Sequence, residues 1–140
     1  LHGPAKLVSK RKDLTFDATL SETPHPDWGQ DFELVFIDGS MIHETVFFHV
    51  ASRTLIAADL IENFQQCDHG VTRWYLKLGG LWKKPGWHPL LRLVYLNRKK
   101  ARASVTRILD WPTERLCLSH GEVITEHARN ALYLGLRWLL

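Results

Sequence analysis

The chain has 140 residues, of which 45% are hydrophobic and 24% are charged. This composition is ordinary for a globular domain and excludes a disordered chain, a collagen-like repeat and a coiled coil. No run of about 18 apolar residues is present, so no transmembrane helix is expected. The length predicts a single domain or a half-domain over residues 1–140.

The first residues and the cysteines bear on the cellular compartment. No basic and apolar leader follows Leu1, so the sequence predicts no signal peptide and a cytoplasmic location. Cys67 and Cys117 are too few for a disulfide framework. Cys117 falls in an apolar stretch and is expected to be a buried thiol. Cys67-Asp68-His69 places three ligand types in a row, but adjacent residues rarely converge on one ion, which favours a loop.

The first half of the chain predicts one short helix and three strands. Pro4 favours a helix over residues 4–12, and the prolines at 24 and 26 favour a loop over residues 16–28. Strands are expected over residues 32–37, 44–50 and 54–58, with turns between them. The third strand is almost entirely apolar, which is typical of a strand with both faces buried.

The second half predicts three helices, a strand and a final helix. The first helix starts near residue 71, and its apolar residues form one stripe: Val71, Trp74, Tyr75, Leu78, Leu81 and Trp82. A short helix over residues 88–96 precedes a longer one over 98–109, for which Asn97 is the N-cap. A strand over 115–118 and a helix over 125–140 follow. The order indicates a mixed α and β fold with one helical layer on a small sheet, which suggests a missing half.

Charge is distributed very unevenly along the chain. There are 18 Lys and Arg residues and 15 Asp and Glu residues, for a net charge of +3. Residues 69–109 contain ten of the basic residues and no acidic one, so the remainder of the chain is acidic. This asymmetry predicts a solvated basic face, docking onto the acidic remainder, or attraction to an anionic partner.

Aromatic residues alternate with basic ones between residues 74 and 96. Such a segment is typical of a helical cap whose aromatic stripe packs on the sheet while its charges face water. It also fits an amphipathic element on an anionic membrane surface. Stacking on nucleic-acid bases is a third and weaker interpretation.

Two residues are candidates for chemistry because each comes just after a predicted strand; if they share a metal ion, we expect their side chains to lie close together at one rim of the sheet. Asp59 follows the strand over 54–58, and His120 follows the strand over 115–118. Carboxylate oxygen and imidazole nitrogen are suitable ligands for zinc, iron or manganese. Two ligands do not complete a site, and the simpler interpretation is a loop carboxylate and a hydrogen-bonded turn histidine. His49 is expected to be a buried, hydrogen-bonded strand histidine, and His127 to be exposed on the last helix.

The segment Glu44–Leu60, which ends in Asp59, resembles the segment of metallo-β-lactamase-fold proteins that leads into their metal-bridging aspartate. Residues 115–121, with His120, resemble the strand-to-histidine motif of that superfamily. The whole chain is similar to an uncharacterised, domain-of-unknown-function branch of it. That closer resemblance rests on Gly3-Pro4 with Leu7, Arg11–Leu14, Val46–His49, Ser52–Leu55, Asp59–Phe64 and Ser119–Gly121.

The resemblance implies the C-terminal half of an αββα sandwich, with Asp59 and His120 as metal ligands. The His-x-His-x-Asp-His run of the superfamily is absent from this chain. Where the superfamily has a further ligand histidine, this chain has Ser40, and His43 lies out of register. The implied function is a metallo-hydrolase-like protein with an incomplete metal site and weak or lost activity. The alternative is a non-catalytic binding module that uses residues 69–109. The missing N-terminal half or a second copy is the partner expected on the uncovered sheet.

Overall fold

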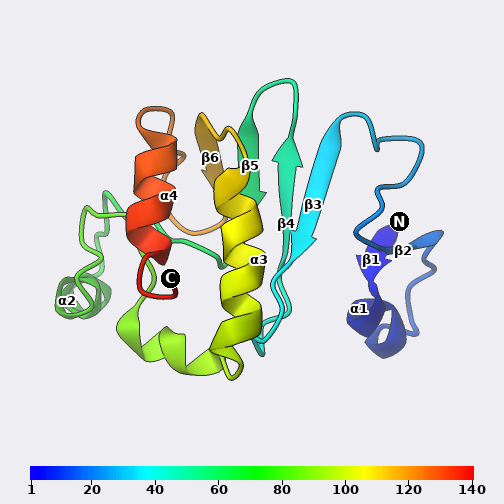
Figure 1. Cartoon of the computed structure of the whole chain (residues 1–140). Helices are drawn as coiled ribbons and strands as arrows, with labels where there is room; N and C mark the ends of the chain where they lie inside the picture. Colours follow the sequence, from blue (N-terminus) through cyan, green and yellow to red (C-terminus); the bar gives the residue numbers. More distant parts are fainter.

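The computed structural model describes residues 1–140 and is built around a four-stranded mixed sheet with helices on one face (Figure 1). The strands β3 (Phe32–Phe36), β4 (Thr45–His49), β5 (Thr54–Ala57) and β6 (Arg115–Leu118) lie in that order. The pairs β3–β4 and β4–β5 are antiparallel, and β5–β6 is parallel. The four strands and the mixed fold class predicted from the sequence are thus confirmed.

The strands alternate between a buried face and a half-buried one. In β4, Val46 and Phe48 are buried while Phe47 is half-buried. In β5, Leu55 is buried and Ile56 is half-buried. The prediction that both faces of this strand are buried is therefore wrong, because helices cover only one face of the sheet (Figure 1).

Helices α3 (Arg98–Asp110) and α4 (Ala128–Leu136) cover that face (Figure 1). Asn97 caps α3 as predicted, since its Oδ1 accepts a hydrogen bond from the Lys100 N–H at 3.1 Å. Helix α4 begins three residues later than the sequence suggested. His127 has φ of +53°, a left-handed conformation that cannot belong to a right-handed helix.

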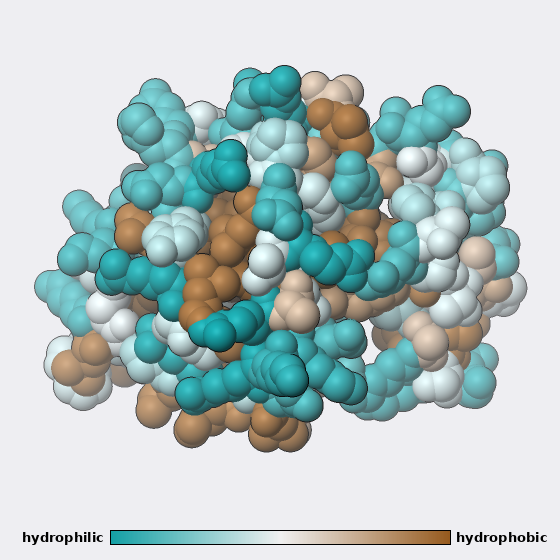
Figure 2. All heavy atoms as spheres, viewed as in Figure 1, coloured by the Kyte–Doolittle hydropathy of each residue, from teal (hydrophilic) through white to brown (hydrophobic).

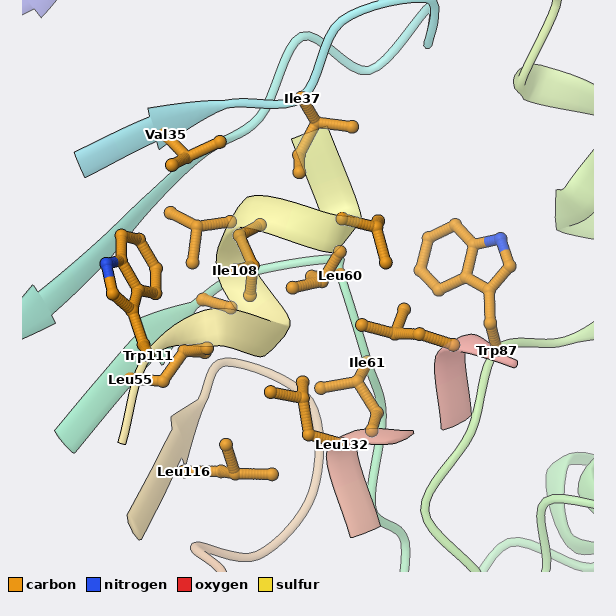
Figure 3. Close-up of a cluster of buried hydrophobic side chains, with 14 of the residues drawn as sticks. Val35, Ile37, Leu55, Leu60, Ile61, Trp87, Ile108, Trp111, Leu116 and Leu132 are labelled. Atoms are coloured by element: carbon orange, nitrogen blue, oxygen red, sulfur yellow. The ribbon is translucent and has the colours of Figure 1, made fainter. Parts of the chain in front are cut away.

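The core lies between the sheet and these two helices (Figure 3). Leu55 of β5 is in register with Leu116 of β6, and both belong to the same buried cluster as Ile108 of α3 and Leu132 of α4. Burying each such side chain stabilises the fold by about 1.5–3 kcal/mol. Leu60 and Ile61, three and four residues after the end of β5, join the same cluster. Their burial anchors the backbone that carries the preceding residue, Asp59.

The first 20 residues form a small separate element beside β3 (Figure 1). Strand β1 (His2–Pro4) pairs in parallel with β2 (Ala18–Leu20), and α1 (Ala5–Lys10) follows β1. The sequence suggested a loop where β2 lies, because a three-residue strand shows no periodic pattern. Trp28 packs against Phe32 and Phe47 with ring centroids 6.3 and 6.4 Å apart.

Helix α2 (Gly70–Leu78) and the 3₁₀-helix η1 (Pro89–Val94) differ most from expectation. Val71, Trp74 and Leu78 are exposed, and Leu76 is the buried residue of α2. The interpretation of this segment as a cap packed on the sheet is wrong for α2, which lies beyond α4, away from the strands (Figure 1). Trp87 and Tyr95, later in the segment, do join the buried core. None of the helices is long and apolar enough to cross a bilayer.

Candidate metal site

The parallel pairing of β5 and β6 brings Asp59 and His120 together. Both strands run in the same direction, so the residues that follow them emerge at the same end of the sheet. His120 Nε2 lies 3.0 Å from Asp59 Oδ1. The two side chains are 48% and 39% exposed, so the pair faces solvent. The expectation that these two residues lie close together at one rim of the sheet is confirmed.

Glu44 holds the backbone that presents Asp59. It lies just before β4, which begins at the end of the sheet where β5 finishes. Glu44 Oε1 accepts hydrogen bonds from the N–H groups of Ala58 and Asp59, at 2.6 and 3.0 Å. A single carboxylate oxygen thus fixes the first two residues after β5. This role was not found from the sequence; the available signal was a charged residue at the start of an apolar strand.

Burial raises the pKa of the Glu44 carboxyl to about 7. The two backbone N–H donors act in the opposite direction, because they stabilise the charged carboxylate. The neighbouring Asp59 charge raises the pKa further, and His120 lowers it. The effect of burial on the Glu44 pKa is larger than that of the two hydrogen bonds, so this carboxyl exchanges a proton near neutral pH.

Asn63 and Gly121 clamp the turn that carries His120. The Asn63 N–H donates to the His120 carbonyl at 3.0 Å, and the Glu122 N–H donates to the Asn63 carbonyl at 2.8 Å. The Asn63 side chain also donates to the Glu122 carbonyl at 2.9 Å. Gly121 has φ of +97°, and a Cβ there would lie 2.0 Å from the Asn63 oxygen. Only glycine allows this close approach of the two backbones.

Two further ionisable groups border the pair. Burial raises the pKa of Glu62, and the Asp59 charge acts in the same direction while His120 opposes it. Burial also raises the pKa of Tyr95 above its ordinary value, with the charges of Glu44 and Asp59 adding to the effect. The electrostatic environment at this end of the sheet is therefore set mainly by carboxylates.

No third ligand joins the pair within this chain. No group of three His, Cys, Asp or Glu residues has an arrangement that could hold a metal ion. Ser40 is buried, and its hydroxyl accepts a hydrogen bond from the Ile42 N–H at 3.2 Å. His43 is exposed and makes no hydrogen bond to Asp59 or His120. The chain thus brings two candidate ligands together, whereas a metal site normally needs three or more protein ligands.

The remaining candidate residues have structural roles or are exposed. The Cys67-Asp68-His69 run is a loop, as expected. Its last residue also caps α2, since His69 Nδ1 accepts a hydrogen bond from the Thr72 N–H. His49 is half-buried and lies 2.7 Å from the Ser52 hydroxyl. His127 is exposed, as predicted. Cys117 is exposed rather than buried, because it lies on the face of β6 that no helix covers.

The chemistry of Asp59 and His120 fits a metal ion in part. Two ligands of one tetrahedral ion, each about 2.0–2.2 Å from it, lie roughly 3.4 Å apart. The 3.0 Å between the two side chains is close to that separation. An oxygen and a nitrogen ligand suit zinc, iron or manganese. The pair therefore fits as two members of a ligand set and leaves at least one further ligand to be supplied.

Comparison with known protein families finds no match for this sequence, and no curated protein matches it either. Comparison with solved structures finds similar chains, including a metallo-β-lactamase from Pontibacter korlensis. The TM-score is 0.53 at 18% sequence identity, over 95% of this chain and 54% of the other. The chain spans about half the length of that protein. It therefore has the fold of about half of a metallo-β-lactamase.

Proposed function

We propose that this chain forms one half of a metallo-hydrolase-like protein, in which Asp59 and His120 are two of the metal ligands. The observation that carries the proposal is the 3.0 Å contact between these side chains at the end of two parallel strands. It is supported by the similarity of the fold to part of a metallo-β-lactamase. The order of the chain's motifs supports a closer relationship to an uncharacterised branch of that superfamily. Its two free cysteines fit a reducing compartment, so we also propose a cytoplasmic location.

A bound zinc, iron or manganese ion would supply an activated water molecule for hydrolysis. The residues of this chain would hold and orient that ion. Asp59 and His120 would contribute the ligand atoms, while the Glu44 carboxylate fixes the backbone by accepting hydrogen bonds from the N–H groups of Ala58 and Asp59. Asn63 holds the His120 turn through the His120 carbonyl. The remaining ligands come from outside this chain.

The sheet face opposite the helices, which Trp28 covers only at its β3 end, is the place for the missing half. Phe32, Phe47 and Ile56 are half-buried there, and Cys117 is exposed. An apolar sheet face without a covering layer is normally paired or covered in a stable protein. We propose that the N-terminal half of the sandwich covers this face; the alternative occupant is a second copy of the chain.

Metal analysis of two purified proteins tests the proposal. One protein is the 140-residue chain, and the other is extended by the sequence encoded upstream of Leu1. We expect stoichiometric zinc, iron or manganese in the extended protein and its loss in Asp59→Ala. Asp110→Ala, which removes an exposed carboxylate at the end of α3, is the matched control and retains the metal. An extended protein that contains no metal, or an Asp59→Ala variant that keeps it, contradicts the proposal.

A further inference from the structure

The 3₁₀-helix η1 exposes a row of leucines on the surface. Leu90, Leu93 and Leu96 are 63%, 72% and 75% exposed. Residues three apart in a 3₁₀-helix lie directly above one another, so Leu90 and Leu93 form a ridge that Leu96 extends. Met41 is also exposed, and its backbone N–H donates to the Val94 carbonyl at 3.0 Å, which places it beside this ridge. We call these four residues the leucine ridge.

The apolar face of α2 adds to this surface. Val71, Trp74 and Leu78 follow the spacing of one helix face, and all three are exposed. Tyr75 of α2 stacks on His88, which caps η1, with ring centroids 4.0 Å apart. In Figure 2 apolar atoms project at the lower and lower left edges, where η1 and α2 lie in Figure 1. A helix normally turns its apolar stripe toward its own core, so this arrangement indicates a partner.

Most of the cations around the ridge have no ion-pair partner within the chain, although Arg92 lies over the Trp138 ring and Arg102 donates to the Leu139 carbonyl. Of the ten Lys and Arg residues between 69 and 109, Arg107 alone forms an ion pair, with Glu22. Arg98, Lys99 and Lys100 occupy the first turn of α3, which begins two residues after Leu96, and that turn has no acidic residue. The dipole of a helix disfavours positive charge at its N-terminus. Three unpaired cations there oppose the stability of α3 and are expected where a function requires positive charge.

We propose that the leucine ridge and the first turn of α3 dock onto an anionic lipid surface. Apolar side chains that enter the boundary between headgroups and acyl chains, flanked by cations, are what such binding requires. Aliphatic side chains dominate the ridge, whereas nucleic-acid binding relies on aromatic rings for stacking. The ridge lies on η1, which packs against the C-terminal end of α4 through Tyr95 and Trp138. It is therefore distinct from the bare sheet face left for the missing half.

Co-sedimentation with vesicles tests this proposal, and the test does not depend on any metal at Asp59 and His120. The vesicles are pure phosphatidylcholine or equal parts phosphatidylcholine and phosphatidylglycerol, at low and high salt. We expect binding to the anionic vesicles alone, weakened by salt. Lys99→Gln with Lys100→Gln should weaken it about thirtyfold, from roughly a fivefold contribution per cation at the surface. The matched control, Lys6→Gln with Lys10→Gln in α1, removes the same charge far from the ridge and should bind as the parent chain does.

A second variant, Leu90→Ser with Leu93→Ser, separates the apolar contribution from the electrostatic one. Both leucines are exposed, so the variant should unfold at the same temperature as the parent chain. It should bind anionic vesicles more weakly at every salt concentration. No binding to either vesicle, equal binding to both, or equal loss in the α1 control overturns the proposal. So does a dimer that this variant dissociates, or preferential binding to a single-stranded oligonucleotide.

Discussion

The substitution Gly121→Ala tests whether the clamp between Asn63 and the His120 turn holds this end of the sheet together. Gly121 has φ of +97°, and an added Cβ would lie 2.0 Å from the Asn63 oxygen and 2.3 Å from its carbonyl carbon. Because contacts of a Cβ are not seen below 3.0 Å, the two backbones would have to separate by about 1 Å. The atoms in the way are backbone atoms, so no side chain can rotate to make room.

The expected loss of stability is about 3–5 kcal/mol. A left-handed backbone costs an alanine about 1–2 kcal/mol. The separation also breaks the hydrogen bonds from Asn63 to His120 and from Glu122 to Asn63, which are 3.0 and 2.8 Å long. Each lost bond costs about 1 kcal/mol, and up to about 3 kcal/mol where a buried group is left without a partner. Asn63 is 4% exposed, so this second condition applies to it.

Gly80→Ala is the matched control, since Gly80 has φ of +70° but no atom within 4 Å of an added Cβ. It should cost about 1 kcal/mol, from backbone strain alone. Urea unfolding followed by tryptophan fluorescence measures both variants, and hydrogen exchange reports the protection of the Asn63 and Glu122 amides. A Gly121→Ala variant as stable as Gly80→Ala, with both amides protected, would refute the clamp.

Three further predictions follow from burial. Glu44→Gln should change the pH dependence of the free energy of unfolding of the metal-free protein. Because the pKa of Glu44 is raised in the folded state, this carboxyl stabilises the parent chain at acid pH. Up to about 3 kcal/mol of that stability is lost as the pH rises from about 4.5 through about 7. Urea unfolding over that pH range should show a shallower decline for Glu44→Gln, and parallel curves would contradict the shift. Leu132→Ala should lower the free energy of unfolding by about 2–5 kcal/mol. Leu134→Ala, at a more exposed position of the same helix, should lower it far less. Equal losses of stability would contradict the assigned core face of α4. Cys117 should react with a thiol reagent in the native 140-residue chain and be protected in the extended protein, and equal reaction in both would argue against a covered sheet face.

Much of the fold follows from local sequence patterns. The strands over residues 32–36, 45–49 and 54–57 lie where β-branched and aromatic residues are bounded by turns, and the strand over 115–118 is a short, mostly apolar run that ends before Ser119-His120-Gly121. Helix α3 begins at the predicted Asn97 cap and ends at Trp111-Pro112. These elements are predictable because capping, turn chemistry and proline act over a few neighbouring residues. The proximity of Asp59 and His120 was also expected, since each follows a strand and two ligands of one ion must lie close together.

Other features depend on contacts between residues that are distant in the sequence. Glu44 was not assigned to the site because its two donors lie 14 and 15 residues away, in the backbone after β5. Cys117 was expected to be buried because an apolar strand does not show which of its faces is covered. The apolar spacing of Val71, Trp74 and Leu78 predicted one helix face correctly and its burial wrongly. Periodicity determines which residues share a face, but the packing of α2 beyond α4, away from the sheet, decided that this face meets solvent.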